Sequence, residues 1–466
     1  MTSPRTIPDT VRNVQIAAAD PEISAFVSAN AGSGKTHVLA QRVINLLLRG
    51  CDPAKILCIT FTKAAAANMA NRVFERLAEW IALDDATFEQ RLRDSTGRIP
   101  TPAQRILACR LFATALETPG GLKVQTIHAF CTSLLHQFPF EADVAARFEV
   151  LDDSATADLL ERLTLDVMQQ AANDPDGPLG QALNIAITAA ADTTFKEVIA
   201  ETIRKRDIII GWVNHAGSVS KAIDNLTLEF GLAAGDTMQA VENEYLSLAS
   251  IPQSDWQALI EIAGASDKST ERDLVERLST ARTASGIEQI VAYRSVFCTN
   301  DLTPRKTLLT KEIAKANPQW LERLLDEQRR ICALIEREHK LRARDRSAAL
   351  LTIASAVIGR YAREKDRRGL LDYDDLIDKT LALFARSSAA WVLYKLDRGI
   401  NHVLVDEAQD TSPKQWKIIT TIVDEFLPGG ARDNVRRTVF AVGDEKQSIF
   451  SFQGADPRAF DATYRH

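Results

Sequence analysis

Two adjacent carboxylates, Asp406 and Glu407, follow a short apolar run in the segment HVLVDEAQDTS at residues 402–412. The apolar run predicts a buried strand. A strand that ends in Asp-Glu suits a nucleotide-hydrolysing site, because Asp406 can hold a hydrated Mg²⁺ while Glu407 takes a proton from the attacking water. The segment therefore predicts phosphoryl-transfer chemistry at the end of this strand.

The segment ANAGSGKT at residues 29–36 predicts the phosphate-binding half of the same site. The general phosphate-loop pattern is G-x-x-x-x-G-K-[ST], and alanine stands here at its first glycine. The two glycines allow a tight turn with inward-pointing N–H groups, and the apolar periodicity that follows predicts a helix whose N-terminus faces an anion. Lys35 would contact the β- and γ-phosphates, and Thr36 the metal. The residues expected around ATP are Ala29, Asn30, Ala31, Gly32, Ser33, Gly34, Lys35 and Thr36. A Gly-Ser turn with a surface lysine is the alternative interpretation.

The elements that must position these segments alternate between strands and helices. Apolar runs predict strands at residues 25–28, 56–60, 123–127, 402–405 and 438–442. Helical stretches separate them, as in a parallel sheet covered by helices on both faces. Between about residues 145 and 365 the alternation gives way to helices, one of them expected over residues 154–172 with Ser154 as its cap. The predicted fold is therefore an α/β nucleotide-binding domain in two segments, 1–144 and 366–466, interrupted by a helical domain at 145–365.

Composition narrows the class of protein. The chain has 466 residues, a hydrophobic content of 45% and no apolar N-terminal segment or run of about 20 apolar residues, so we expect a cytoplasmic protein without membrane association. Its six cysteines contain no C-x-x-C pair, which predicts neither a zinc site nor a disulfide framework. The formal net charge of −6 means that any nucleic-acid contact must come from local patches. One basic excess lies in residues 323–368, where a solvated helical face is an equally good interpretation.

An ordered series of motifs carries a resemblance to a known family. The series is Gln15, ANAGSGKT (29–36), ITFTKAAAANMANR (59–72), QTIHAFC (125–131), LVDEAQDTSPKQ (404–415) and VGDEKQSIFSFQGADP (442–457). It resembles the N-terminal motor half of the UvrD/Rep-type superfamily 1A helicases, and within that group most resembles the AddA helicase–nucleases. The resemblance implies a RecA-like P-loop NTPase domain, ATP and Mg²⁺ as cofactors, 3′–5′ DNA helicase activity in double-strand break repair, and an AddB-type partner subunit.

The resemblance also implies roles for residues outside the two segments described first. Gln15 would read the adenine, since its side-chain amide offers a donor and an acceptor. Gln447 would sense the γ-phosphate and act with Lys35, Asp406 and Glu407 in catalysis. Arg42, two turns into the helix after the phosphate loop, is expected either to reach the nucleotide or to form a structural salt bridge.

DNA contacts are implied at three places: Thr60, Phe61 and Thr62; Thr126, His128 and Phe130; and Phe450 and Phe452. Hydroxyls and backbone amides can bind phosphates, and an aromatic ring can stack on any base without reading its identity. Such contacts would not be sequence-specific. Burial in the core is the alternative for Phe61, Phe130 and Phe450, and a structural role is the alternative for His128.

The resemblance covers only part of an AddA-type protein. The chain ends at His466, before the second RecA-like domain, its arginine finger and the nuclease domain. Since an arginine finger contributes about 10³–10⁵ in kcat, we expect this chain alone to bind ATP yet hydrolyse it poorly. A UvrD/Rep-type helicase without nuclease, and a non-catalytic ATP-gated module that binds DNA or a partner, are the alternatives.

Overall fold

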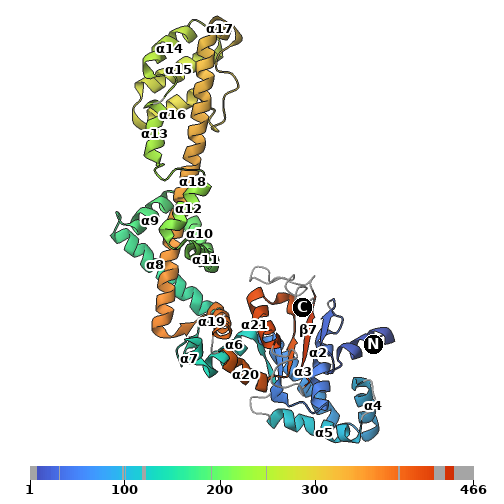
Figure 1. The fold of residues 1–466 in the computed structure, drawn as a ribbon. Coiled ribbons are helices and arrows are strands. Elements are labelled where there is room, and N and C mark those ends of the chain that lie inside the picture. The colour runs from blue at the N-terminus through green and yellow to red at the C-terminus, as the bar shows by residue number, and fades with distance from the viewer. Residues whose placement is uncertain are drawn as a thin grey trace. The chain divides into compact units, whose positions relative to one another are not determined.

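The computed structural model describes residues 8–30, 32–96, 99, 101–117, 122–189, 192–247, 249–386, 389–424 and 436–444 (Figure 1). The chain forms two compact units, one from Met1–Thr156 with Lys365–His466 and the other from Ala157–Glu364. The first unit holds both nucleotide-site segments.

The first unit is built on a parallel sheet of five strands in the order β1-β7-β6-β2-β3. The strands are β1 (Ala25–Ser28), β2 (Ile56–Thr60), β3 (Lys123–Thr126), β6 (His402–Val405) and β7 (Thr438–Gly443). The parallel α/β sheet predicted from the sequence is confirmed, with strand ends within one residue of expectation. The two late strands, β6 and β7, lie between β1 and β2, so distant parts of the chain form one sheet.

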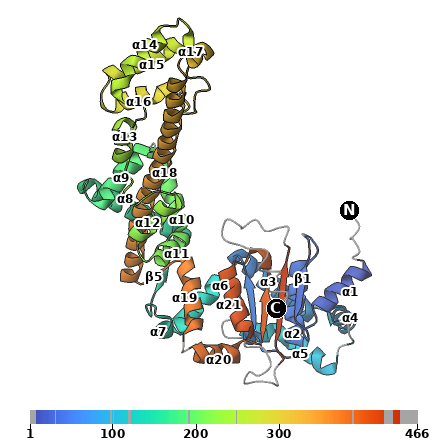
Figure 2. The ribbon, with the colours of Figure 1, turned by 45° about the horizontal axis from the view of Figure 1, so that its top comes forward.

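Helices cover both faces of this sheet (Figure 2). Alternate residues of β2 enter opposite cores, with Leu57 and Ile59 in one and Ile56 and Cys58 in the other, as the two-residue period of a strand requires. The Leu57 core is completed by α6 (Ile127–Gln137), α7 (Pro139–Ala142), α19 (Tyr373–Ala385), α20 (Ala389–Gly399) and α21 (Pro413–Asp424). The Ile56 core is completed by α2 (Lys35–Leu48), α3 (Lys63–Ile81), α4 (Asp85–Thr96) and α5 (Pro102–Glu117), with α1 (Asp9–Ala18) beside it.

Short elements join these parts. The 3₁₀ turns η1 (Pro53–Lys55) and η3 (Ala408–Asp410) precede β2 and follow β6. Strands β4 (Glu149–Val150) and β5 (Leu370–Leu371) form a separate two-stranded parallel sheet. Directly after β5, Asp372 and Asp375 form a capping box at the start of α19.

The second unit is helical and organised along α18 (Pro318–Arg368), which has 51 residues. The other elements are α8 (Asp153–Asn173), α9 (Pro178–Ala189), α10 (Asp192–Arg204), α11 (Arg206–Ala216), α12 (Val219–Glu229), α13 (Met238–Ser247), η2 (Gln253–Asp255), α14 (Trp256–Gly264), α15 (Ser269–Thr283), α16 (Gly286–Phe297) and α17 (Lys311–Ala316). The expected cap at Ser154 is wrong: α8 begins at Asp153, and the Asp152 carboxylate accepts the Ala155 N–H at 2.8 Å.

Arginines recur every seven residues along α18, at Arg323, Arg330, Arg337 and Arg344. Since seven residues make about two helical turns, these side chains share one side of the helix. Arg323 donates to the Ser250 carbonyl, and Arg330 donates to the carbonyls of Glu244 and Tyr245. Arg337 donates to the carboxylates of Asp236 and Glu244, and Arg344 donates to the Asp236 carbonyl. Part of the basic excess at residues 323–368 is therefore used inside the helical unit.

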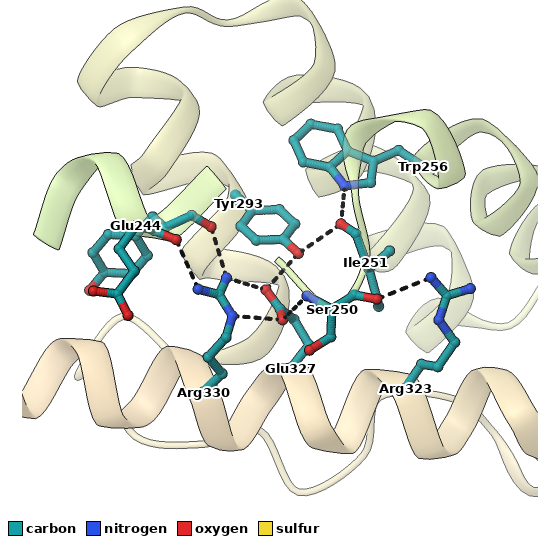
Figure 3. A network of polar contacts seen from close by, with 9 residues as sticks. Glu244, Ser250, Ile251, Trp256, Tyr293, Arg323, Glu327 and Arg330 are labelled. Carbon is teal, nitrogen blue, oxygen red and sulfur yellow. Dashed lines mark hydrogen bonds and ion pairs between the residues drawn. The ribbon is translucent and has the colours of Figure 1, made fainter. Parts of the chain in front are cut away.

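Glu327 lies at the centre of this network and is fully buried (Figure 3). Its Oε1 accepts the Tyr293 hydroxyl at 2.8 Å and Arg330 Nη2 at 2.6 Å. Its Oε2 accepts the Ser250 N–H at 2.8 Å and Arg330 Nε at 2.9 Å. Four donors thus compensate one buried carboxylate, which is what a charge removed from water requires.

In the part of the chain that the structure describes, no helix is long and apolar enough to cross a membrane.

Candidate nucleotide site and nucleic-acid interface

Four of the predicted site segments lie where strands of the five-stranded sheet end. Because all five strands are parallel, their carboxyl ends meet at one edge. The phosphate loop follows β1, and Asp406 and Glu407 follow β6. Segments 60–62 and 126–130 begin at the ends of β2 and β3.

The phosphate loop is a tight connection between β1 and α2. The Ala29 N–H donates to the Gly443 carbonyl at 3.1 Å, which attaches the start of the loop to the end of β7. Gly32 and Gly34 have φ of +76° and +87°, in the left-handed region that favours glycine. The N-terminus of the 14-residue helix α2 follows directly, and its unpaired N–H groups suit an anion.

Lys35 and Glu407 meet although 372 residues separate them, with Lys35 Nζ 3.5 Å from Glu407 Oε2. The lysine side chain is 9% exposed and the glutamate side chain 37%. Glu407 has a left-handed backbone with φ of +49°, which costs a non-glycine residue about 1 kcal/mol or more. This strained turn redirects the chain after the buried strand and leaves the carboxylate partly open to solvent.

Asp406 is buried, and its N–H donates to the Ile59 carbonyl of the neighbouring strand at 2.9 Å. Burial, together with the charge of Glu407, raises the pKa of Asp406 to about 6, although the Glu407 N–H and the charges of Lys35 and Arg72 oppose this. A buried carboxylate of this kind gains from a nearby cation. The oxygen donors of Asp406 and Thr36 are the type that Mg²⁺ prefers, so these residues fit the expected metal.

Gln15 lies against the phosphate loop, as its Nε2 donates to the Ser33 carbonyl at 3.0 Å. A Cβ on Gly34 would stand 3.0 Å from the same nitrogen. The structure thus brings Gln15 to the loop from α1. Among the loop residues, Ala31 lies outside those described.

Arg42 is not brought to the loop, and its assignment as a nucleotide contact needs correction. The side chain is fully buried, and its Nη1 donates to the carbonyls of Ala18 at 3.0 Å and Asp20 at 2.7 Å, while Nη2 donates to Ile23. The arginine therefore joins α2 to the segment between α1 and β1.

The candidate DNA contacts at the ends of β2 and β3 lie side by side, because Thr60 is paired with Thr126 in the register of the two strands. Thr62 is exposed, and its hydroxyl oxygen accepts the Ala65 N–H at the start of α3. Thr126 is buried, and its hydroxyl oxygen likewise accepts the Ala129 N–H at the start of α6. The two hydroxyls therefore cap helices that cover opposite faces of the sheet but begin at the same edge.

The aromatic and histidine candidates differ in accessibility. Phe61 is half-buried, and Thr60 is buried with its hydroxyl donating to the Thr62 carbonyl at 3.1 Å. Phe130 is 6% exposed in the hydrophobic core, so the core interpretation holds and its assignment as a DNA contact needs correction. His128 contacts the Tyr373 ring with centroids 4.9 Å apart, and burial lowers its pKa, so it is neutral at pH 7. The predicted contacts Gln447, Phe450 and Phe452 lie outside the described residues.

Two residues at this edge were missed from the sequence. Gln409 is 1% exposed and donates to Glu407 Oε2 at 2.8 Å. Burial, the charge of Arg76 and then the charge of Arg72, both on α3, lower the pKa of His37, and the charge of Arg72 also opposes the rise in the pKa of Asp406. Gln409 lies in the motif LVDEAQDTSPKQ and Arg72 in the motif ITFTKAAAANMANR. Their polar side chains within these motifs were the sequence feature that could have indicated a role at the site.

Comparison with known proteins shows the family of the chain. A family model described as the UvrD/REP helicase N-terminal domain matches residues 11–466. The chain belongs to the UvrD/REP helicase family. This UvrD/REP chain is also similar to curated proteins named as the AddA subunit of an ATP-dependent helicase/nuclease. The relative from Latilactobacillus sakei is 27% identical over 94% of this chain and 49% of its own length. Those from Ligilactobacillus salivarius and Enterococcus faecalis are 25% and 24% identical over 97% and 96% of this chain. The chain spans 36% and 35% of these two proteins, and thus between about a third and a half of all three relatives.

Proposed function

We propose that this UvrD/REP chain is the ATP-binding motor part of an ATP-dependent 3′–5′ DNA helicase of the AddA helicase–nuclease type. Such a protein would process double-strand breaks in the cytoplasm together with an AddB-type partner subunit. The observation that carries the proposal is the contact between Lys35 and Glu407 at 3.5 Å. It joins a phosphate loop to a carboxylate pair, which is the combination that phosphoryl transfer from ATP to water requires.

Each side chain then has a defined task. Lys35 and the N-terminus of α2 bind the triphosphate, while Gln15 approaches from the side of the loop. Asp406 and Thr36 would hold Mg²⁺, which supplies positive charge at the phosphate oxygens when bound. Glu407 accepts the proton of the attacking water, for which its carboxylate is partly solvent-accessible.

We further propose that single-stranded DNA crosses the edge formed by the ends of β2 and β3. Two adjacent helix N-termini, those of α3 and α6, lie there and suit phosphate groups. The exposed hydroxyl of Thr62 can donate to a phosphate while its oxygen caps α3. These contacts involve the backbone of the nucleic acid, so binding would be insensitive to sequence. We also propose that residues 145–365 are a helical domain inserted between the two segments of the motor domain.

Lys35→Ala tests the phosphate-loop assignment. We expect it to weaken binding of a fluorescent ATP analogue by about 100-fold or more, because a charged contact to phosphate contributes about 3 kcal/mol. Lys55→Ala is a matched control that removes one positive charge beside the start of β2, at the opposite end of the strands. Equal affinities of the two variants for the analogue would contradict the assignment.

Glu407→Gln tests the general base. The amide keeps the size of the side chain but cannot accept the proton, so in the full-length protein DNA-stimulated hydrolysis should fall by about 10²–10⁴ while the analogue still binds. Turnover within a few-fold of wild type would show that another group is the base.

A further inference from the structure

Gln409 lies between the candidate general base and the end of β7. Its Nε2 donates to Glu407 Oε2 at 2.8 Å, and its Oε1 accepts the backbone N–H of Asp444 at 2.8 Å. The residue belongs to η3 and is 1% exposed. One side chain therefore links the exits of two neighbouring strands, β6 and β7.

The network determines the orientation of this amide. The Asp444 N–H can only donate, so the amide oxygen must face it and the NH₂ group must face Glu407. Glutamate at this position would meet Glu407 with a second carboxylate in place of a donor. A residue that joins these two groups must offer a donor and an acceptor at once, which glutamine does at this length.

The packing around Gln409 leaves little freedom. A Cβ added to Gly443 would stand 2.7 Å from Gln409 Oε1 and 3.3 Å from its backbone nitrogen. Gly443 is the last residue of β7, and its carbonyl also accepts the Ala29 N–H of the phosphate loop. Position 443 favours glycine because the Gln409 amide occupies the space that a Cβ would need.

Glu407 needs such support because its side chain is 37% exposed and its backbone is strained. Both of its close contacts, with Lys35 and Gln409, use Oε2. Within the described ranges no hydrogen bond uses Oε1, which leaves that oxygen for the attacking water. A carboxylate fixed through one oxygen and open at the other has the orientation that proton abstraction requires.

We propose that Gln409 is a positioning residue that holds the Glu407 carboxylate for catalysis and couples its orientation to the end of β7. This inference rests on the proposed function. The sequence after β7 includes Gln447, Phe450 and Phe452, for which the resemblance implies contacts to the γ-phosphate and DNA. Because Asp444 directly follows β7, a change at the end of this strand would act through Gln409 on the general base.

The test is steady-state ATP hydrolysis by the purified full-length protein, with and without single-stranded DNA. For Gln409→Ala we expect kcat to fall by about 10- to 100-fold, the usual effect of losing a group that orients a reacting residue, with KM for ATP nearly unchanged. DNA should stimulate hydrolysis less than in wild type. Gln415→Ala is the matched control, because Gln415 is 9% exposed in the same motif and accepts the Ser412 N–H at the start of α21. We expect it to lower stability without lowering kcat.

A double-mutant cycle separates positioning from a structural role. If Gln409 acts only through Glu407, Gln409→Ala should cause no further loss of kcat in the Glu407→Gln background. A purely structural effect would lower kcat by the same factor in both backgrounds, which would overturn the proposal. So would a Gln409→Ala enzyme with wild-type kcat.

Two further variants keep the proposal testable if Gln409→Ala folds poorly. Gln409→Glu preserves shape but loses the donor, and Gly443→Ala pushes on the amide oxygen. Both should lower kcat with little change in the affinity for an ATP analogue, and wild-type kcat in both would overturn the proposal. If Lys35→Ala hydrolyses ATP as fast as wild type, both the proposed function and this inference are overturned. If only the Gln409 variants keep the wild-type kcat, this inference is overturned and the proposed function stands.

Discussion

Arg42 offers the sharpest test of how the motor domain is held together. Its guanidinium is fully buried and donates to three carbonyls, those of Ala18, Asp20 and Ile23. It also lies over the Phe440 ring, 5.1 Å from the centroid. Burial lowers the pKa of Arg42 to about 10, so the charge persists at neutral pH.

Arg42→Leu removes all the donors at once. Ala18 and Asp20 are half-buried and Ile23 is exposed, so water can partly replace the lost donors; at about 1 kcal/mol for each lost hydrogen bond, the three together cost about 3 kcal/mol. This is a large part of the roughly 5–15 kcal/mol by which a domain is stable. Arg42→Lys keeps the charge, but one ammonium nitrogen cannot reach all three carbonyls, which lie in different directions around the planar guanidinium. We therefore expect the free energy of unfolding to fall by about 1–3 kcal/mol.

Urea unfolding of the variants measures these losses, with Arg49→Leu, at the C-cap of the same helix, as the control. Arg49 is 40% exposed and pairs with Glu22 at the surface, so its loss should cost under about 1 kcal/mol. Folded Arg42→Lys should bind an ATP analogue within about threefold of wild type, a difference of less than 1 kcal/mol. A variant that unfolds like wild type yet binds the analogue tenfold more weakly would place the guanidinium at the nucleotide and refute the structural role.

Three further outcomes follow from buried groups. Burial and the charge of Arg42 lower the pKa of His402 from 6.5 to about 4. His402 therefore binds a proton at a higher pH in the unfolded chain than in the folded chain. The free energy of unfolding is greatest above pH 6.5 and falls by about 3 kcal/mol as the pH decreases to 4. His402→Gln should make this decrease smaller in urea unfolding, and an unchanged dependence on pH would contradict the assignment. Glu327→Gln places an NH₂ group against the donors that the carboxylate accepts from Tyr293, Ser250 and Arg330. It should destabilise the helical unit by about 2–4 kcal/mol in thermal unfolding, whereas Glu336→Gln, at an exposed position, should cost under about 0.5 kcal/mol. The sulfur atoms of Cys298 and Cys332 lie 3.9 Å apart, so oxidation by diamide should join them, slowly because burial raises the pKa of Cys298 to about 12. The 34-residue separation corresponds to a stabilisation of about 3–4 kcal/mol, and intact thiols after prolonged treatment would refute the pairing.

The strands were predictable because β2, β6 and β7 are buried on both faces and therefore read as continuous apolar runs. Parallel strands place their carboxyl ends together, so the phosphate loop and the DEAQD segment could be expected at one edge. Strand order was not predictable in this way. It depends on pairing between distant segments, such as Ile59 with Val405, for which no local pattern exists.

Arg42 was misplaced because α2 is not an amphipathic surface helix. Every residue from Val38 to Leu48 is buried, polar ones included, since the helix is enclosed on all sides. Polar side chains in such a helix must find partners inside the protein. Arg42 does so with carbonyls, and Asn45 donates to the Ala19 carbonyl at 2.9 Å. A pattern of apolar positions does not reveal this, because it describes one face only.

Phe130 and the arginines of α18 also show that a local sequence pattern does not reveal what a side chain contacts in the fold. Phe130 is four residues after the capping Thr126, about one helical turn, and that turn faces the core. The charge count in residues 323–368 predicted a basic surface as readily as a solvated face. The seven-residue spacing of four arginines was visible in the sequence, but only the neighbouring segment with Asp236 and Glu244 shows what that side of α18 contacts.

The order of strands also bears on how nucleotide and DNA sites would communicate. β6, which ends in the carboxylate pair, lies between β7 and β2. The Asp406 N–H is bound to the Ile59 carbonyl of β2, one residue before Thr60, and Gln409 is bound to Asp444 after β7. Of the three segments expected to contact DNA, the one that begins at Thr60 and the one that follows β7 leave the two strands next to β6, and both exits are hydrogen-bonded to the segment carrying the general base. If single-stranded DNA binds at these two exits as we propose, a change in their arrangement would reach Glu407 through the hydrogen bond between Ile59 and Asp406 and through Gln409.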